Sequence, residues 1–303
     1  MISSLYQRAD LLRSDAPFEV LFLLTTKCNL RCTFCCEQGT ELNREIHQMS
    51  QYVRPLVNDL GVTLIDLNGG EPLLRKKADI LNLLKIIANQ DALASISTNA
   101  LILDEQYVRE LSQYTPIVNV SLHGVNYSTH DKLVRVPGAH DKIIKNIRRL
   151  ITHDIDVHVT SIVLNENINE MPALAELCYK EGAETFCMNV LFGRGRGKNI
   201  LHEQHQTVAT LLPLRDALRK QYGKSLHIYV NESNVGQCVL VRPNGLLVGA
   251  PQNPKCANDG LISIGDVLDK DISEKWNSYA HKENHRTYNR EKFARYFGMQ
   301  DAS

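Results

Sequence analysis

The amino-acid sequence predicts an α/β fold built on a parallel sheet, with a small α+β region at its C-terminal end. Two observations carry this prediction. Short β-branched apolar segments alternate with amphipathic segments from residue 18 onward, and this alternation stops near residue 224. Strands that alternate with helices form right-handed βαβ units with parallel strands. We therefore expect a lead-in over residues 1–17, a parallel-sheet α/β domain of six strand–helix units over residues 18–224, and an extension with a tail over residues 225–303.

Six segments have the apolar composition of buried strands. They lie at residues 18–24, 63–67, 93–97, 117–122, 155–163 and 185–191. Helices are expected between and after them, at residues 49–60, 76–90, 104–113, 138–153, 168–181 and 202–222. The helix over 138–153 has the clearest pattern, because Ile143, Ile147 and Leu150 share one face.

Beyond residue 224 the pattern changes. A turn at Pro243-Asn244-Gly245 separates two apolar runs, which is typical of a β-hairpin. A short helix is expected near residues 272–282.

Charge and hydropathy exclude two kinds of partner. The 303 residues contain 34 Lys+Arg and 34 Asp+Glu, so the formal net charge is zero. A general binder of nucleic acid or of membrane surfaces needs a basic excess, so we expect neither partner. The longest apolar runs, such as residues 20–24, are far shorter than the roughly 20 residues of a bilayer span. The first residues lack the apolar stretch of a secretory signal, so we expect a cytoplasmic protein.

The eight cysteines are the unusual feature of the composition, and four of them lie between residues 28 and 36. Disulfide scaffolds are usually short secreted chains, so this cluster indicates a reduced compartment and a metal or redox site. Cys28-x3-Cys32-x2-Cys35 follows the first strand, at the edge where parallel α/β folds place ligands. Three thiolates can hold three irons of a [4Fe–4S] cluster and leave the fourth iron open. Zinc normally takes four ligands and fits less well.

This spacing, with Phe34 before the third cysteine, resembles the radical S-adenosylmethionine (SAM) superfamily. The resemblance implies that Cys28, Cys32 and Cys35 hold a [4Fe–4S] cluster whose open iron binds the amino and carboxylate groups of SAM. It further implies that SAM is cleaved to methionine and a 5′-deoxyadenosyl radical, which abstracts a substrate hydrogen. An electron donor such as flavodoxin or ferredoxin would supply the electron. The fold implied is a partial (β/α)6 barrel of the radical SAM type.

The segment after the second strand resembles the GGEP motif of this family. The resemblance assigns Gly69, Gly70, Glu71 and Pro72 to the amino end of SAM. Taken alone, the segment is a tight turn between a strand and a helix. Its place after the cysteine loop favours the SAM-binding role.

Three further strand ends match the family over roughly residues 18–200. Asn99 and Ser121 end the third and fourth strands, and the resemblance places both against the nucleoside of SAM. His123 stands where the family commonly has Asp. Arg194 follows the sixth strand and is assigned to the SAM carboxylate, because a guanidinium fork suits a carboxylate. A flexible basic loop is the equal alternative for Arg194.

The other cysteines have different expected roles. Cys178 shares a helical face with apolar residues and is expected in the core. Cys238 and Cys256 lie in a region similar to the SPASM/twitch extension, which binds auxiliary Fe–S clusters in the family, although Ala250 replaces an expected Cys. Two cysteines are too few for a full [4Fe–4S] cluster.

Three alternatives stay open for Cys238 and Cys256. They are remnants in a cluster-free extension, they share an incompletely ligated auxiliary Fe–S cluster, or one of them is a thiol that returns a hydrogen atom to the substrate radical. Cys187, on the sixth strand, is a third candidate for this hydrogen-donor role, although a purely structural packing role is the simpler interpretation.

The predicted function is therefore that of a radical SAM enzyme acting on a peptide or small-molecule substrate. The extension favours maturation of a ribosomally made peptide or another natural product. A sugar or small-molecule epimerase or dehydrogenase of the same superfamily is one alternative. A non-enzymatic regulatory protein that binds an Fe–S cluster or zinc is another.

Overall fold

The computed structural model describes residues 16–37, 45–114, 117–231, 239–249 and 261–282. The strands of these residues form one sheet in the order β10-β9-β8-β1-β2-β3-β4-β5-β6-β7. In chain order they are β1 (Glu19–Thr25), β2 (Leu64–Gly69), β3 (Leu93–Thr98), β4 (Ile117–Ser121), β5 (Asp156–Ile162), β6 (Thr185–Asn189), β7 (His227–Asn231), β8 (Val239–Val241), β9 (Leu246–Gly249) and β10 (Ile262–Asp266).

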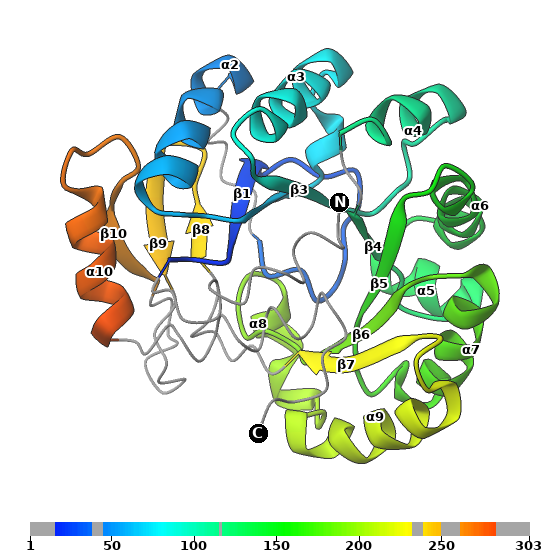
Figure 1. Cartoon of the computed structure of the whole chain (residues 1–303). Coiled ribbons are helices and arrows are strands. Elements are labelled where there is room, and N and C mark those ends of the chain that lie inside the picture. Colours follow the sequence, from blue (N-terminus) through cyan, green and yellow to red (C-terminus); the bar gives the residue numbers. More distant parts are fainter. Residues whose placement is uncertain (1–15, 38–44, 115–116, 232–238, 250–260, 283–303) are drawn as a thin grey trace.

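Strands β1 to β6 pair in parallel with their sequence neighbours, which confirms the predicted α/β barrel. The sheet curves around a central axis, and most of the helices lie on its outer face (Figure 1). Period-2 alternation explains this arrangement. Phe22 and Leu24 of β1 are fully buried against the helices. Leu21 and Leu23 point inward and line a cavity.

The predicted helices occur in the predicted order, together with two helices that were not predicted, over residues 127–134 and 197–200. They are α2 (Ile46–Met49), α3 (Lys77–Ala88), α4 (Glu105–Leu111), α5 (Tyr127–Val134), α6 (Ala139–Thr152), α7 (Met171–Glu181), α8 (Gly197–Ile200), α9 (Val208–Tyr222) and α10 (Ile272–Lys282). Ile143, Ile147 and Leu150 of α6 are buried, as the helical pattern predicted. No helix in the described part of the chain is long and apolar enough to cross a bilayer.

Two predicted helices differ from the structure. The helix expected at 49–60 is a series of short turns: α2, the 3-10 helix η2 (Ser50–Tyr52) and the π-helix η3 (Pro55–Asp59). Pro55 has no N–H to continue an α-helical ladder. The helix expected from residue 202 begins at Val208, because Thr207 and Thr210 form a capping box there.

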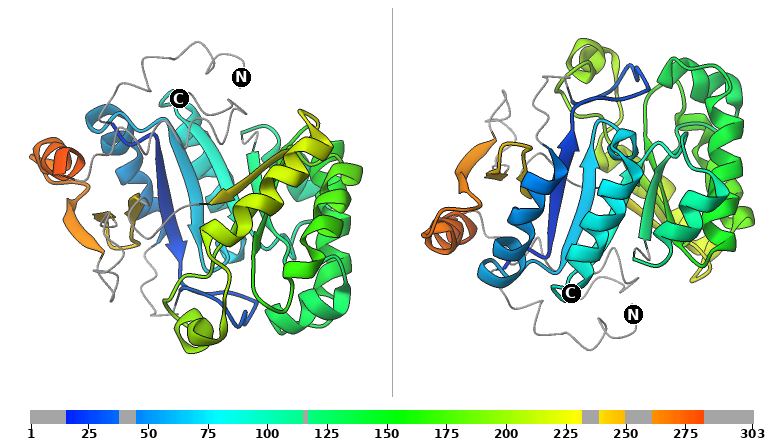
Figure 2. Two further views of the ribbon diagram at one scale, coloured as in Figure 1. Left: turned by 90° about the horizontal axis from the view of Figure 1, so that it is seen from below. Right: turned by 90° about the horizontal axis from the view of Figure 1, so that it is seen from above.

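The C-terminal strands extend the barrel sheet at its first strand. β8 and β9 form the predicted hairpin, with Gly245 at φ 87° in the turn. Leu240 of β8 is paired with Leu21 of β1 in parallel, so the hairpin continues the same sheet. Figure 2 shows α10 beside this end of the sheet and α9 at the opposite end.

Strand β7 lies beyond residue 224, where the sequence predicted the end of the barrel. It pairs in parallel with β6, for example Thr185 with His227. The sheet is thus continuous across residue 224. The division into a barrel over 18–224 and an extension over 225–303 stays a prediction.

Candidate active site

The inner face of the curved sheet encloses a cavity of about 400 Å³, a volume usual for a small-molecule site. Inward-pointing side chains of β1 to β7 line its walls, and the loop after β1 lines its mouth. The mouth is the carboxyl edge of the parallel strands, which is where such folds place their ligands.

The three predicted cluster cysteines, Cys28, Cys32 and Cys35, all line this cavity. Their thiols are free and partly exposed. The Cys28 sulfur accepts hydrogen bonds from the Leu30 N–H at 3.4 Å and from Asn99 Nδ2 at 3.8 Å. Burial raises the pKa of Cys28, and it raises the pKa of Cys32 to about 12. A cationic metal would reverse this preference, because thiolates are the ligating form.

Two distant segments hold the cysteine loop in place. The end of α5 accepts hydrogen bonds from it, with Arg31 N to Val134 O at 3.1 Å and Thr33 N to Leu133 O at 3.0 Å. The loop after β6 adds two more through Arg196, whose N–H bonds the Cys35 carbonyl at 2.8 Å and whose Nε bonds the Cys32 carbonyl at 2.7 Å. The sequence pattern did not identify Arg196.

The glycines of the GGEP segment pack directly against the end of β1. A Cβ added at Gly69 would lie 2.3 Å from the Thr25 carbonyl oxygen, and one at Gly70 would lie 2.2 Å from that of Lys27. The Gly70 N–H bonds the Thr25 carbonyl at 2.7 Å. Both glycines line the cavity, so they also allow a ligand to approach the backbone closely.

Glu71 and Pro72 were predicted to contact SAM, but neither lines the cavity. The Glu71 carboxylate is fully buried and accepts hydrogen bonds from Leu73 N at 3.0 Å, Thr98 Oγ1 at 2.7 Å and Asn99 N at 2.8 Å. Burial raises its pKa, and these three donors oppose the rise. Glu71 thus joins the end of β2 to the end of β3. Its direct contact with SAM stays a prediction.

The other predicted SAM contacts, Asn99, Ser121 and Arg194, line the cavity mouth. Asn99 bonds Asn29 Oδ1 through Nδ2 at 2.7 Å, so it links β3 to the cysteine loop. Gly195, beside Arg194, has a φ of +55°, and a Cβ there would lie 2.4 Å from the Cys35 carbonyl oxygen. The structure therefore brings these side chains and the cysteines to one place.

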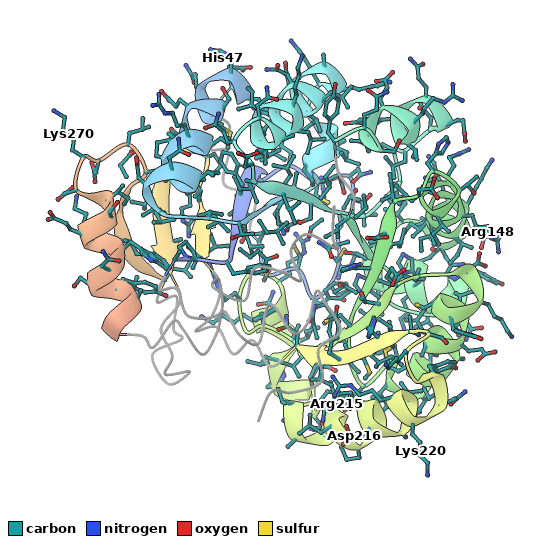
Figure 3. The ribbon with its side chains drawn as sticks, viewed as in Figure 1. His47, Arg148, Arg215, Asp216, Lys220 and Lys270 are labelled. Carbon is teal, nitrogen blue, oxygen red and sulfur yellow. The ribbon has the colours of Figure 1, made fainter. Side chains whose placement is uncertain are left out.

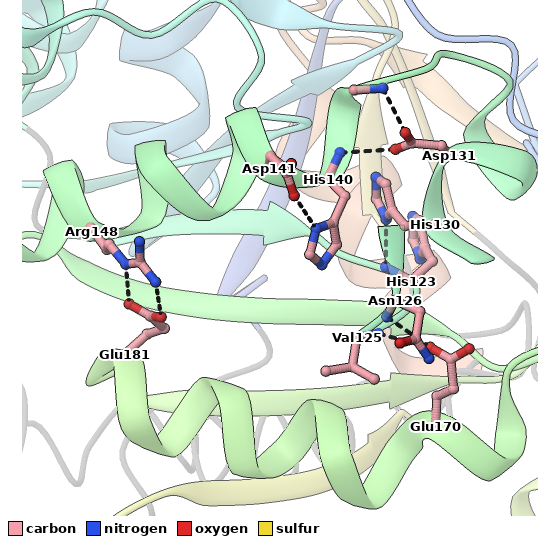
Figure 4. A network of polar contacts seen from close by, with 11 residues as sticks. His123, Val125, Asn126, His130, Asp131, His140, Asp141, Arg148, Glu170 and Glu181 are labelled. Carbon is pink, nitrogen blue, oxygen red and sulfur yellow. Dashed lines mark hydrogen bonds and ion pairs between the residues drawn. The ribbon is translucent and has the colours of Figure 1, made fainter. Parts of the chain in front are cut away.

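His123 is a buried link between β4 and β5, although it also lines the cavity. Its Nδ1 accepts the Ile162 N–H at 3.1 Å, and its own N–H donates to His130 Nδ1 at 3.1 Å. Figure 4 shows the two imidazole rings stacked, and their centroids are 5.7 Å apart. Burial lowers the pKa of His123 well below its usual value, so the ring is neutral. It also packs edge-on against Phe34 of the cysteine loop.

The structure places Cys178 and Cys187 in different environments. Cys178 is buried in α7, which confirms its expected place in the core. Cys187 lines the cavity, and its thiol donates a hydrogen bond to Asn189 Oδ1 at 3.3 Å. Cys238 and Cys256 lie outside the described residues.

These residues fit a [4Fe–4S] cluster with SAM. Three thiols face one cavity, backbone and amide N–H groups point at the Cys28 sulfur, and two glycines leave room beside them. Among the residues the structure describes, no three His, Cys, Asp or Glu side chains converge closely enough to bind one metal ion. A cluster takes one thiolate per iron, so its ligands need not converge on a single atom.

A family described as the radical SAM superfamily matches residues 22–178 of the chain. The chain is 28% identical over 188 residues to the Fe-coproporphyrin III synthase of Methanosarcina barkeri, a match that covers 61% of this chain and 46% of that protein. It is 27% identical over 199 residues to the antilisterial bacteriocin subtilosin biosynthesis protein AlbA of Bacillus subtilis, over 63% of this chain and 44% of AlbA. The matches thus span less than half the length of these relatives.

The fold is similar to that of Streptococcus suis SuiB in its crystal structure bound to S-adenosylmethionine. The TM-score is 0.71 at 15% sequence identity, over 94% of this chain and 72% of SuiB. At this identity the likeness shows the fold, and it confirms the predicted fold class.

Proposed function

Because the chain belongs to the radical SAM superfamily, we propose that it uses its cluster and SAM to abstract a hydrogen atom from a substrate in peptide or natural-product maturation. One observation carries the proposal. The three cysteines, the two glycines and the strand ends at Asn99 and Ser121 all face one cavity. A flavodoxin or ferredoxin is the proposed electron donor.

The side chains of this chain divide the work between binding and positioning. Cys28, Cys32 and Cys35 would hold the cluster; when bound, the cluster and SAM supply the electron and the 5′-deoxyadenosyl radical. Gly69 and Gly70 would let SAM lie against the backbone. We assign Asn99 and Ser121 to its nucleoside and Arg194 to its carboxylate.

Glu71 acts as a positioning residue in this proposal. Its carboxylate holds the backbone of Asn99 and the side chain of Thr98, so it sets the distance between two strand ends that face the cofactor. Buried and hydrogen-bonded networks of this kind fix a site more firmly than exposed loops do.

The names of the relatives support two substrate classes, a peptide and a small molecule. The name of AlbA connects it to a bacteriocin, which favours a peptide. The name of the Fe-coproporphyrin III synthase points to a small molecule. Cys187 favours a second candidate, an epimerase of the same superfamily, because its thiol lines the cavity where it could return a hydrogen atom.

Anaerobic reconstitution tests the proposal. The expected product is a brown protein with about four irons and matching sulfide per chain, which cleaves SAM on reduction with dithionite. Iron beyond about four per chain would indicate an auxiliary cluster, and loss of this excess in Cys238→Ala and Cys256→Ala would place it at those cysteines. Cys32→Ala should abolish SAM cleavage, whereas Cys178→Ala, a buried cysteine away from the cavity, should retain it. A colourless zinc protein, or cleavage that survives in Cys32→Ala, would refute the proposal.

A further inference from the structure

The interior of the barrel contains a buried carboxylate that the proposed SAM chemistry does not use. Asp66 lies in the middle of β2, three residues before Gly69, and therefore about 10 Å below the mouth of the cavity. It lines the cavity and is 1% exposed. A charged residue at this depth needs partners, because burial disfavours its ionised form.

Four side-chain donors surround Asp66. Its Oδ1 accepts from Ser95 Oγ at 2.8 Å and from Asn119 Nδ2 at 3.4 Å. Its Oδ2 accepts from Ser97 Oγ at 2.8 Å and from Asn68 Nδ2 at 2.8 Å. A carboxylate has about four acceptor positions, so this set uses all of them.

The contacts of Asp66 decide what its neighbours can offer a ligand. The Ser97 hydroxyl hydrogen and an Asn119 amide hydrogen are directed to the carboxylate. Ser97 therefore keeps its oxygen lone pairs for a ligand, and Asn119 keeps its carbonyl oxygen and one amide hydrogen, so acceptors outnumber donors on these two side chains. The interior therefore combines a negative charge with acceptor atoms.

Thr185 provides an independent sign of a ligand. It is 2% exposed and lines the same cavity, and its Oγ1 has no hydrogen-bond partner among the residues that the structure describes. The register places it in one row across the sheet with three polar residues, Ser97, Asn119 and His158. A buried hydroxyl without a hydrogen-bond partner is rare, so we expect a bound ligand to supply the partner of Thr185.

The charges around the cavity favour a cation. Among the described lining residues Arg194 is the single Lys or Arg, and it belongs to the loop at the mouth. Burial lowers the pKa of His158 to about 4, so this ring is neutral at neutral pH. Burial and the charge of Glu19 raise the pKa of Asp66 to about 6, so Asp66 is still ionised above that pH.

We propose that the chamber formed by Asp66, Ser97, Asn119, His158 and Thr185 binds a protonated amine or guanidinium group of the substrate. The group would come from a basic side chain of a peptide or from a small-molecule amine. An ammonium or guanidinium offers only donors, which matches acceptors and a negative charge. The inference rests on the proposed function in one respect, because it takes this cavity as the substrate chamber.

Calorimetric titration of the reconstituted, SAM-bound protein under anaerobic conditions tests the chamber with two matched pairs of probes. Nα-acetyl-lysine amide is compared with Nα-acetyl-norleucine amide, and n-pentylamine with 1-pentanol. The charged member of at least one pair should bind about tenfold or more tightly than its neutral partner, as expected for a hydrogen-bonded charge. The pair with the tighter charged member identifies a peptide or a small amine as the source.

Variants connect this preference to the chamber. Asp66→Asn should reduce it to about twofold or less, and Thr185→Val, which keeps the side-chain shape, should weaken binding of the charged probe several-fold. Asp216→Asn, on the outer side of α9, should leave the preference unchanged (Figure 3). Cluster content shows whether Asp66→Asn has folded; if it has not, Thr185→Val decides alone.

Equal affinity within both probe pairs at millimolar concentration, or a preference unchanged in Thr185→Val and in folded Asp66→Asn, would overturn this inference. SAM cleavage without any probe is measured in parallel. A protein that does not cleave SAM refutes the proposed function. A protein that cleaves SAM but binds both members of each pair equally refutes the amine-binding chamber alone.

Discussion

Arg196 donates a hydrogen bond from Nε to the carbonyl oxygen of Cys32 at 2.7 Å, across 164 residues of sequence. Its backbone N–H bonds the carbonyl of Cys35 at 2.8 Å. The loop after β6 therefore holds two of the three cluster cysteines in their positions. A cluster bound by these thiols would depend on a residue that does not itself bind iron.

We expect Arg196→Gln to retain the cluster poorly. The change removes a charge-assisted hydrogen bond worth about 1.5–3 kcal/mol, so the cluster should be lost about tenfold faster or more. The measurement is the decay of the visible absorbance of the cluster in the presence of an iron chelator. Arg194→Gln, two residues away, is the matched control and should weaken SAM binding without speeding cluster loss. Equal rates of cluster loss in Arg196→Gln and wild type would contradict the positioning role.

Gly70→Ala should displace the cysteine loop. Its Cβ would lie 2.2 Å from the Lys27 carbonyl oxygen and 2.8 Å from the Thr26 carbonyl carbon, and these backbone atoms cannot rotate away as a side chain can. SAM cleavage should fall more than about tenfold, because small misplacements of reacting groups are costly. Gly138→Ala is the comparison: φ there is +74°, but no atom lies within 4 Å of the added Cβ. It should cost about 1–2 kcal/mol of stability and leave SAM cleavage intact. Similar cleavage by the two variants would refute the steric argument.

Cys187→Ala separates radical formation from the final hydrogen transfer. If the Cys187 thiol returns a hydrogen atom to the substrate radical, the variant should still form 5′-deoxyadenosine but should lose the product. Chromatography of both compounds from one reaction gives the answer. The same substitution at Cys238 and at Cys256 tests the other two candidates. Full product formation by Cys187→Ala would remove Cys187 from the mechanism.

Protonation of the buried His130 imidazole should lower the free energy of unfolding in mild acid. Burial lowers its pKa to about 4, below the value of about 6.5 expected in the unfolded chain. The unfolded state therefore binds the proton more readily, and the stabilisation present above about pH 6.5 is lost as the pH falls toward 4. Between about pH 7.5 and about pH 5.5 this loss is about 1.3 kcal/mol.

A variant isolates this effect from other titrating groups. Asp66 has a raised pKa and acts in the opposite direction over part of the same range. His130→Asn keeps an acceptor near Nδ1 for the His123 N–H but does not titrate. Urea unfolding at both pH values should show that wild type loses about 1.3 kcal/mol more than the variant on acidification. Parallel losses in the two proteins would show that His130 is not the group responsible.

Much of the fold could be predicted from the sequence because its signals are local. Strand positions agree within two residues for β1 to β6, since apolar β-branched runs separated by amphipathic helices are visible in the chain itself. The cysteine spacing and the glycines after β2 likewise identified the cavity mouth. The prediction of one continuous helix at 49–60 was wrong, because Pro55 interrupts the α-helical hydrogen bonds and a π-helix begins there.

The parts that could not be predicted depend on distant partners. The GGEP resemblance predicted that Glu71 contacts the cofactor, yet three hydrogen-bond donors within the protein surround its carboxylate. Arg196 could not be separated from Arg194 by pattern, because only the folded chain brings its side chain to Cys32. Asp66 was visible as a charge inside an apolar strand, a signal that the sequence interpretation passed over.

The sequence by itself determined the alternation of strands and helices, the three-cysteine loop and its position after the first strand. Those properties arise from residues within a few positions of one another, so periodicity and spacing express them directly. The tertiary structure decided that Cys187 and Asp66 face the same cavity, that Glu71 is used within the protein, and that Arg196 supports the cysteine loop. Each of these depends on which strands are neighbours in the barrel. Contacts between residues that are tens to hundreds of positions apart leave no pattern in the local sequence.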